Sequence, residues 1–293
     1  MATLALDIGG TKIAAGRIDL NTGGVQDIHA IMVPDRGVWD VTKALLREVA
    51  AGEKVERVGI ASAGPVDMAA GITAPINVPE WRSGFGIVAA VKDQFPDAQI
   101  RFALDGVCIA LAEQRYGAAR NVPDALVMTV STGVGGGILV GGFTAVGRSG
   151  NAGHVGHIQV SGFDDPCSCG GRGCVEAIAS GPSSVRWARS QGWHGETGKD
   201  LADAAQAGDP VAVAALHRAG TALGQAIASA AALLDVDLVV VGGGFAQSGP
   251  PLWDPLREAV QRQAGLGFLA NLRVVASPLR DSATLVGAGV LVS

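Results

Sequence analysis

The stretch Thr3-Leu-Ala-Leu-Asp-Ile-Gly-Gly-Thr-Lys12 begins as an apolar run and ends in two adjacent glycines followed by polar residues. Residues 13–18 form a second short run that is largely apolar. Because glycine adopts positive φ angles without steric cost, this pattern predicts two strands joined by a glycine turn. Such a turn is either a tight hairpin and nothing more, or a place where a ligand approaches bare backbone.

A second stretch of the same kind, Ala125-Leu-Val-Met-Thr-Val-Ser-Thr-Gly-Val-Gly-Gly-Gly137, is followed by the apolar residues 138–140. A third glycine cluster, at 242–244, ends the apolar segment 238–241. Because the first two stretches are alike, we predict two domains of related construction. The chain has 293 residues, and this length agrees with two domains because one domain takes roughly 150 residues.

The polar stretch 118–124 is the expected boundary between an N-terminal domain, 1–120, and a C-terminal domain, 121–293. Strands interleave with segments of helical period, which indicates an α/β class. Residues 281–293 are expected to pack back on the N-terminal domain as a final helix, with Asp281 and Ser282 as candidate caps. The predicted helices are 41–50, 85–95, 106–116, 175–189, 210–234, 252–263 and 281–291, and a further strand is predicted at 100–104.

Composition excludes several classes of protein. The formal net charge of −5 argues against a protein that binds nucleic-acid phosphates through a basic surface. Asp7 lies within the first ten residues, where a secretory signal has a basic start and an apolar run. The apolar runs are shorter than the roughly 18 residues of a membrane-spanning helix. We therefore expect a cytoplasmic protein with neither a nucleic-acid nor a membrane partner.

One region of the chain has the pattern of a metal site. Gly153-His-Val-Gly-His157 is followed, after nine residues, by Cys167-Ser-Cys-Gly-Gly-Arg-Gly-Cys174. Three thiolates and one imidazole suit a closed tetrahedral zinc site, in which the metal has a structural role. The alternative is a set of three buried, reduced thiols. The predicted ligands of structural Zn²⁺ are His157, Cys167, Cys169 and Cys174.

The glycine turns also suit phosphate, because backbone N–H groups in such turns can point together at an anion. Asp7 lies beside the first turn, where a carboxylate can meet a metal-bound group. Thr11, Lys12 and Thr132 add side-chain donors. The chain has no G-x-x-x-x-G-K-[ST] motif, and no G-x-G-x-x-G follows the first strand, so neither a P-loop nor a dinucleotide-binding fold is indicated.

The motifs Asp7-Ile-Gly-Gly-Thr-Lys12 and Ser131-Thr-Gly-Val-Gly-Gly-Gly137 resemble the two phosphate motifs of the actin-like ATPase superfamily of sugar kinases. The cysteine region narrows this resemblance to the ROK family, and the resemblance covers essentially the whole chain. It implies a two-domain actin-like ATPase fold, ribonuclease H-like, with a central cleft, and ATP and Mg²⁺ as cofactors. The nucleotide-binding residues that it implies are Asp7, Gly9, Gly10, Thr11, Lys12, Thr132, Gly133, Gly135, Gly243 and Gly244.

Asp105 ends a predicted strand and opens a predicted helix. Taken alone, the residue is a helix N-cap. The resemblance to the ROK family implies instead that Asp105 is the general base, which takes the proton of the acceptor hydroxyl. The family pattern at this point is Asn-Asp-Ala, whereas this chain has Leu104-Asp105-Gly106. The missing Asn removes one expected hydroxyl contact and predicts altered specificity or weakened activity.

The resemblance implies a set of sugar-binding residues as well. Pro75-Ile-Asn-Val-Pro-Glu-Trp81 is similar to the family's Asn-Leu-Pro-x-Trp segment, although a loop Asn beside Pro is by itself typical of a turn. Glu176 matches a family sugar ligand and is otherwise an ordinary acid in the first turn of a helix. The implied set is Gly64, Asn77, Asp105, His154, His157 and Glu176.

His154 bears on which sugar is bound. Glucokinase-like members have Glu at this position, whereas Ala152-Gly-His-Val-Gly-His157 resembles the bacterial N-acetylmannosamine kinases of the family. An imidazole can donate as well as accept a hydrogen bond, unlike a carboxylate. The expected reaction is therefore phosphorylation of the 6-hydroxyl of N-acetylmannosamine by ATP. The alternatives are a glucokinase or a broad-specificity hexose kinase, with His154 a neutral variant.

Two further alternatives lie outside this activity. A sugar-sensing regulator of the same family carries a helix-turn-helix ahead of the first phosphate motif, but only six residues precede Asp7, so we do not expect one. A catalytically silent sugar-binding protein is the second alternative, because of Leu104. The expected partners are a hexose or N-acetylhexosamine substrate and, from the resemblance, a second copy of the chain in a homodimer.

Overall fold

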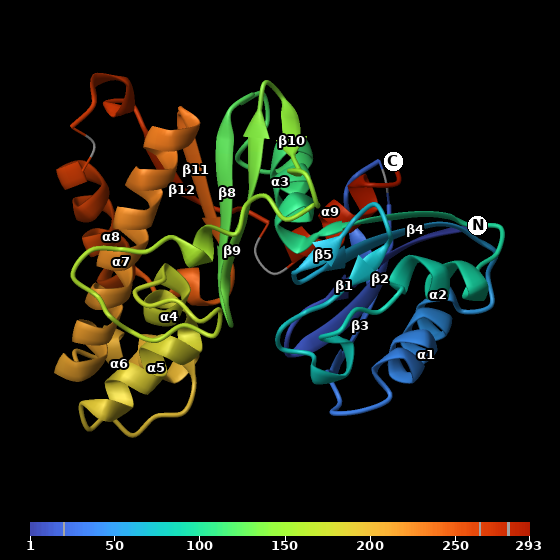
Figure 1. Ribbon diagram of the computed structural model, residues 1–293, viewed down its shortest axis with the longest axis horizontal. Coiled ribbons are helices and arrows are strands. Elements are labelled where there is room, and N and C mark those ends of the chain that lie inside the picture. Colours follow the sequence, from blue (N-terminus) through green and yellow to red (C-terminus); the bar gives the residue numbers. More distant parts are fainter. Residues whose placement is uncertain (20, 264, 280–281) are drawn as a thin grey trace. The chain divides into compact units, whose positions relative to one another are not determined.

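The computed structural model describes residues 1–19, 21–263, 265–279 and 282–293. Internal contacts divide the chain into two compact units (Figure 1). Unit 1 consists of Met1–Asn121, Phe143–Gly153 and Ser282–Ser293, and unit 2 consists of Val122–Gly142 and His154–Asp281.

Three separate segments build unit 1. Besides the chain up to Asn121 they include Ser282–Ser293, within the segment expected to pack on the N-terminal domain, and Phe143–Gly153, which lies beyond the expected boundary at 118–124. The segment 143–153 belongs to unit 1 because the amide of Asn151 pairs with the backbone of Val66. Asn151 Oδ1 accepts a hydrogen bond from the Val66 N–H at 2.9 Å, and Asn151 Nδ2 donates one to the Val66 carbonyl at 2.7 Å. Such a long-range pairing leaves no local trace in the sequence.

The sheet of unit 1 has the strand order β3-β2-β1-β4-β7. Strands β1 and β2 form the predicted hairpin, β3 extends it antiparallel, and β4 and β7 run parallel to β1. Helix α1 packs on one face of this sheet, and α3 and α9 pack on the other (Figure 1). The elements of unit 1 are β1 (Ala2–Ile8), β2 (Lys12–Ile18), β3 (Val25–Met32), α1 (Val38–Ala50), β4 (Val55–Ser62), β5 (Val66–Asp67), β6 (Ile72–Thr73), a 3₁₀ turn (Pro79–Trp81), α2 (Ile87–Gln94), β7 (Gln99–Leu104), α3 (Asp105–Tyr116), β10 (Phe143–Ala145) and α9 (Ala283–Val290).

Helix α9 approaches its neighbours at backbone distance. A Cβ atom on Gly59 of β4 would overlap the carbonyl oxygen of Ala288, and one on Gly287 would overlap the carbonyl oxygen of Cys108 on α3. Only glycine allows such close contact between backbones. Ser282 occupies the N-cap position of α9, whereas Asp281, the other predicted cap, lies outside the described residues.

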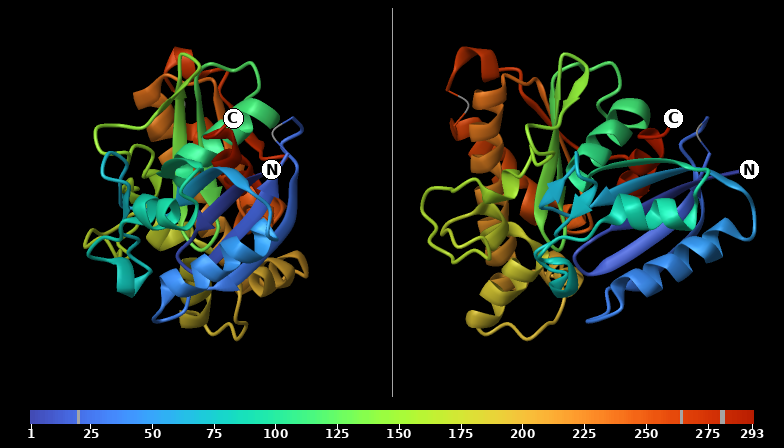
Figure 2. Two further views of the ribbon diagram at one scale, coloured as in Figure 1. Left: turned by 90° about the vertical axis from the view of Figure 1, so that its right-hand side faces the viewer. Right: turned by 45° about the vertical axis from the view of Figure 1, so that its right-hand side comes forward.

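The second five-stranded sheet repeats the construction of the first, and the strands of it that belong to unit 2 lie in the order β9-β8-β11-β12. Strands β8 and β9 form an antiparallel hairpin, and β11 and β12 lie parallel to β8. Helices α7 and α8 pack against one another beside this sheet (Figure 2). The elements of unit 2 are β8 (Ala125–Val130), β9 (Val134–Val140), a 3₁₀ turn η2 (Val155–His157), α4 (Val175–Ala179), α5 (Gly181–Ser190), α6 (Gly198–Gln206), α7 (Pro210–Leu234), β11 (Leu238–Gly242), η3 (Phe245–Gln247), α8 (Pro250–Gln263), η4 (Gly267–Leu269) and β12 (Arg273–Ala276).

The predicted single helix at 175–189 was wrong, because the structure divides it into α4 and α5. Ser180 has extended backbone, with ψ of 154°, and its hydroxyl accepts a hydrogen bond from the Ser183 N–H as the cap of α5. Pro182 stands in the first turn of α5, where the missing proline N–H costs no helical hydrogen bond. A cap followed by proline therefore starts a new helix.

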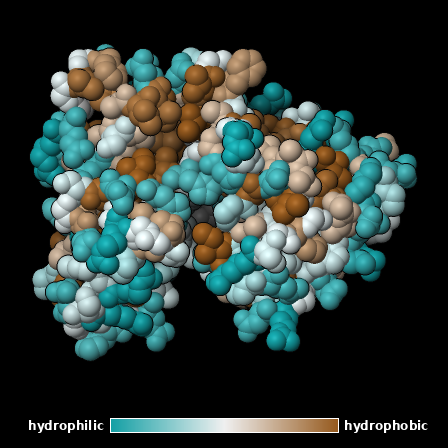
Figure 3. Space-filling view, viewed as in Figure 1, coloured by the Kyte–Doolittle hydropathy of each residue, from teal (hydrophilic) through white to brown (hydrophobic). Residues whose placement is uncertain are grey.

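Helix α7 has the predicted bounds, 210–234, because Asp209 and Pro210 mark its start. The Asp209 carboxylate accepts hydrogen bonds from the N–H groups of Val211 and Ala212 at 2.9 Å. None of the described helices is both long enough and apolar enough to cross a membrane. The face drawn in Figure 3 mixes hydrophilic and hydrophobic residues, and the exposed large apolar side chains of the molecule include Phe143 and Leu233.

Candidate functional site

Two carboxylates lie at the same edge of the unit 1 sheet. Strands β1, β4 and β7 are parallel, and their register aligns Ile8 with Ser62 and Ser62 with Leu104. Asp7 precedes the first of these residues and Asp105 follows the last, so the strand ends bring the two acids to one edge.

Asp7 is half-buried, and its pKa is raised from 3.8 to about 7. Burial is the largest cause, the negative charge of Asp105 adds to it, and the positive charge of Lys12 opposes it. This edge therefore carries more negative charge than its surroundings stabilise, and a divalent cation would offset that excess. Carboxylate oxygens are ligands that Mg²⁺ prefers, so the residues present fit this ion.

Asp105 is the first residue of α3 rather than its N-cap. Leu104 occupies the N-cap position and makes no side-chain capping bond, which corrects the capping alternative. The Asp105 carboxylate accepts a hydrogen bond from the Gly106 N–H at 2.7 Å. Leu104 is 2% exposed and packs in the core of unit 1, so its side chain brings no polar atom to this edge.

The first glycine loop lies against the predicted sugar segment. A Cβ atom on Gly10 would come within 2.9 Å of the Cβ of Asn77, so the missing side chain leaves room for that residue. The Gly9 N–H donates to the Lys12 carbonyl at 3.0 Å and closes the turn, which leaves Thr11 and Lys12 exposed. Gly64 follows Ala63, whose N–H donates to the carbonyl of Ile8 at the end of β1.

Within unit 2 the second and third glycine clusters lie next to one another. The register of β8 and β11 aligns Thr129 with Gly242, so the loops that follow the two strands leave the sheet at the same edge. Gly243 has φ of +94°, and a Cβ atom there would lie 2.5 Å from the carbonyl oxygen of Val130. A Cβ atom on Gly244 would lie 3.9 Å from the Ser131 hydroxyl. Beside them, Thr132 is exposed, and Gly133 and Gly135 are half-buried.

Glu176 makes a contact that sequence reasoning missed. Its Oε2 accepts a hydrogen bond from the N–H of Val134 at 2.9 Å. A Cβ atom on Gly133 would lie 2.7 Å from the same oxygen, so the carboxylate lies directly over the second glycine loop. The two residues are 42 positions apart, and no local pattern could have announced the contact.

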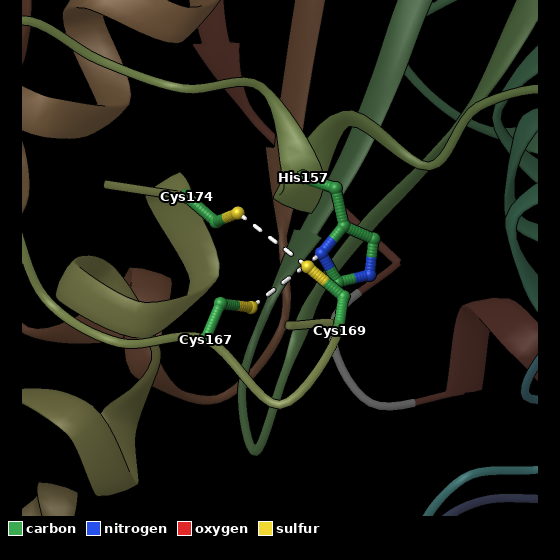
Figure 4. A group of neighbouring side chains, drawn as sticks. All are labelled: His157, Cys167, Cys169 and Cys174. Carbon is green, nitrogen blue, oxygen red and sulfur yellow. Dashed lines mark hydrogen bonds between the residues drawn. The ribbon is translucent and has the colours of Figure 1, made fainter. Parts of the chain in front are cut away.

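The four predicted zinc ligands converge in unit 2 (Figure 4). The donor atoms of His157, Cys167, Cys169 and Cys174 all lie within 4.8 Å of one another. Cys167 Sγ lies 3.7 Å from His157 Nδ1, and Cys169 Sγ lies 3.7 Å from Cys174 Sγ. Tetrahedral zinc with Zn–S bonds of about 2.3 Å separates its ligands by about 3.8 Å, so the donor set fits this metal.

The surroundings of the cysteines differ. The N–H of Gly171, 3.4 Å from Cys169 Sγ, lowers the pKa of that exposed thiol. Burial raises the pKa of Cys174 to about 12. Zinc binds thiolates, so loading this site releases protons.

The loop that carries the cysteines is anchored to two helices of unit 2. Arg218 of α7 forms an ion pair with Asp165, and its guanidinium lies 5.1 Å from the ring centre of Phe163 and 5.5 Å from that of Trp187 on α5. Arg218 is the only Asp, Glu, Lys or Arg in the sequence from Pro210 to Leu234. A single charged residue on an otherwise uncharged helix is a sequence signal that could have identified Arg218 as a residue with a specific partner.

The two histidines of the motif have different surroundings. His157 turns Nδ1 toward Cys167, and Figure 4 shows its second ring nitrogen directed away from the three sulfurs. His154 occupies the N-cap position of η2, and the two ring centres are 6.0 Å apart. His157 was predicted to bind both metal and substrate, and its ring offers one nitrogen for each.

The sequence pattern that describes the ROK family matches residues 3–293. The chain belongs to the ROK family. Among curated relatives, N-acetylmannosamine kinase of Escherichia coli O1:K1 is 34% identical over 297 residues, which cover 99% of this chain and 98% of the relative. Glucokinase of Thermotoga maritima is 29% identical over 311 residues, covering 99% and 96%.

Solved structures of ROK proteins match the whole fold. The ROK glucokinase of Streptomyces griseus, solved with glucose and AMPPNP, has a TM-score of 0.88 and 32% identity and covers 100% of this chain and 99% of its own. The ROK hexokinase of Thermus thermophilus has a TM-score of 0.82 and 31% identity, and the match covers 100% and 98%. The predicted fold class, α/β with the actin-like ATPase architecture, is confirmed.

Proposed function

We propose that this ROK chain transfers the γ-phosphoryl group of ATP to the 6-hydroxyl of a hexose, with N-acetylmannosamine as the substrate. The single observation that supports the chemistry best is the pair of carboxylates at one sheet edge, Asp7 and Asp105, in a chain whose glycine clusters suit phosphate. The relatives named above are sugar kinases, which supports ATP-dependent sugar kinase activity as the class.

In this proposal Asp105 is the general base. Its carboxylate takes the proton of the 6-hydroxyl as the hydroxyl oxygen bonds to the γ-phosphorus and the bond to ADP breaks. Asp7 would hold Mg²⁺, directly or through water, and the ion supplies positive charge to the phosphates when it is bound. Thr132, Gly133 and Gly135, with Gly243 and Gly244, offer N–H and hydroxyl donors to the phosphate oxygens.

The proposal assigns the sugar to a set of polar side chains. Asn77, His154 and Glu176 offer donors and acceptors to its hydroxyl groups, and the second nitrogen of His157 adds one more. Zinc on His157 and the three cysteines has a structural role in this assignment, since all four positions of a tetrahedral ion are filled. The proposed assembly is a homodimer.

The choice of N-acetylmannosamine rests on His154, which stands where glucokinase-like members have Glu. A glucokinase is the second candidate, favoured by the likeness to the Streptomyces griseus enzyme solved with glucose.

A transcriptional regulator of the family, a homologue of the Escherichia coli MLC protein, has the same fold with a TM-score of 0.84 and 23% identity. This chain covers 77% of that protein.

The test is ADP release with ATP and Mg²⁺ and a panel of N-acetylmannosamine, N-acetylglucosamine, glucose and mannose. We expect the highest kcat/KM with N-acetylmannosamine. Asp105→Asn should abolish turnover and preserve sugar binding measured by calorimetry. Turnover with glucose alone would refute the substrate assignment, and no turnover with any of the four sugars would favour the silent sugar-binding protein.

A further inference from the structure

Val134, the residue after the first glycine of the second loop, is contacted by both ends of the zinc-binding segment. It is 5% exposed and begins strand β9. Its N–H donates to Glu176, two residues after the ligand Cys174. Its carbonyl oxygen lies against Gly156, one residue before the ligand His157, where a Cβ atom would overlap it.

The two ends of the zinc-binding segment are also joined to each other. The N–H of Val160 donates to the Gly173 carbonyl at 2.9 Å, and the N–H of Val175 donates to the Ile158 carbonyl at 2.9 Å. The chain after His157 therefore pairs with the chain around Cys174, and a metal ion held by both ligands would fix the spacing of Gly156 and Glu176.

This spacing restricts where Val134 can lie, because Glu176 accepts its N–H and Gly156 packs against its carbonyl oxygen. Strand pairing with Val130 positions Val134 as well. Val134 lies between Gly133 and Gly135, which the proposed function assigns to nucleotide phosphates. A shift at Val134 moves the N–H groups of both neighbours, and phosphate binding depends on the direction of those groups.

On the basis of that nucleotide assignment, we propose that Glu176 and Gly156 hold the second glycine loop in its nucleotide-binding shape, so that zinc and nucleotide binding are coupled. Glu176 is then a positioning residue for the nucleotide in addition to its assigned contact with sugar. Coupling between two sites is reciprocal, so zinc tightens the binding of nucleotide and nucleotide tightens the binding of zinc by the same factor.

The first experiment measures ADP affinity without sugar, by calorimetry, in the zinc-loaded chain. Glu176→Ala should weaken ADP binding about tenfold, the size of effect expected for one hydrogen bond to a charged acceptor. Glu176→Gln should bind ADP almost as well as the parent chain, because an amide oxygen accepts the same Val134 N–H. If Glu176 acts on sugar alone, neither substitution changes ADP affinity, and that result would overturn the proposal.

Gly156→Ala tests the other contact without altering any assigned ligand. The added methyl group must displace the Val134 carbonyl, so ADP affinity should fall while one zinc per chain is retained. Asp164→Ala is the matched control, because Asp164 lies on the same loop and its ion pair is with the exposed Arg172. The control should leave ADP affinity unchanged, and an equal loss in both variants would contradict the proposal.

The second experiment measures zinc affinity by competition with a chromophoric zinc chelator, with and without ADP. ADP should raise zinc affinity in the parent chain by at least the factor that Glu176→Ala removes, and should raise it less in Glu176→Ala, where only the Gly156 contact remains. Equal zinc affinity with and without ADP in the parent chain would overturn the coupling.

Hydrogen exchange over residues 131–137 separates failure of the coupling from failure of the proposed function. Glu176→Ala should speed exchange there because the Val134 N–H loses its acceptor. Faster exchange with unchanged ADP affinity would refute the nucleotide assignment, and the coupling with it. If the parent chain binds ADP and Glu176→Ala leaves hydrogen exchange over residues 131–137 unchanged, only the coupling is refuted.

Discussion

Asp7 is a residue whose ionisation depends strongly on the folded state. In the folded chain its pKa is about 7, against 3.8 for the ordinary side chain. Between these two pH values the folded chain keeps a proton that the unfolded chain has lost, so this group makes the ligand-free protein less stable as pH rises from about 4 to 7. The difference corresponds to at most about 4 kcal/mol in the free energy of unfolding.

Asp7→Asn removes this charge and should therefore stabilise the ligand-free chain at pH 8 but not at pH 4. The gain should be about 1–3 kcal/mol, because local rearrangement and water relieve part of the charge in the parent chain. Denaturant unfolding of both chains over this pH range measures it. The control is Asp19→Asn: hydrogen bonds from Asn21 and Thr22 lower the pKa of Asp19, so Asp19→Asn should give no such gain. An Asp7→Asn gain that is the same at pH 4 and pH 8 would contradict the burial argument.

His154 is the single residue on which the choice of sugar rests. His154→Glu exchanges an imidazole, which donates and accepts, for a carboxylate that accepts only. We expect the ratio of kcat/KM for glucose to kcat/KM for N-acetylmannosamine to rise by about tenfold or more, since loss of a hydrogen-bond match at a sugar hydroxyl costs about that much. Steady-state ADP release with the two sugars measures the ratio, and an unchanged ratio would make His154 a neutral variant.

The strands, helices and loops differ in how far their own sequence predicts them. The two hairpins and α7 were predictable because apolar periodicity, glycine turns and an Asp-Pro start act locally. The break at Ser180 was not recognised, although Ser followed by Gly-Pro carried the signal. Helix α6 was not predicted, although Thr197 and Asp200 form a capping box, and β3 was not predicted because most of its residues are exposed.

The shape of the zinc loop depends on metal ligands from two short segments of the chain. Cys169→Ser and Cys174→Ser should each reduce zinc content from one ion per chain to a small fraction and lower Tm, since a structural zinc contributes directly to folding. Metal analysis and calorimetry measure both. Cys108→Ala is the control. Cys108, the fourth cysteine, lies buried on α3 of unit 1, so the Cys108→Ala variant should retain one zinc per chain. Full zinc retention in Cys169→Ser and Cys174→Ser would exclude the structural zinc site.

For the molecule as a whole, the sequence indicated the fold class and an expected packing of the last segment on the N-terminal domain, but not that residues 143–153 belong to unit 1. The membership of 143–153 and 282–293 in unit 1 depends on contacts across long stretches of chain, such as Asn151 with Val66 and Ala288 with Gly59. The candidate site shows the same contrast between residues that a local pattern predicts and contacts that depend on distant parts of the chain. Its motif residues were predictable because their types and spacing are local, whereas the contact of Glu176 with Val134 was not.

Removal of residues 283–293 should therefore destabilise unit 1 more than unit 2. Without α9, α3 and the sheet lose a neighbour that packs at backbone distance, and buried apolar surface becomes exposed. Hydrogen exchange should show loss of protection in β1, β4 and α3, with α7 and the zinc loop still protected and zinc still bound. Equal loss of protection in both units would show that they do not fold independently.

The ion pair and ring contacts of Arg218 have a consequence for how zinc enters the chain. Arg218 ties Asp165 and Phe163, ahead of the first cysteine, to α5 and α7 through side chains that are not zinc ligands, so these contacts would restrict the loop independently of the metal. Metal uptake then requires only closure of the last few bonds, and its rate should follow encounter of ion and chain rather than a slow search by the loop. Arg218→Ala would reintroduce that search, and stopped-flow mixing with zinc would show it as a slow phase independent of metal concentration.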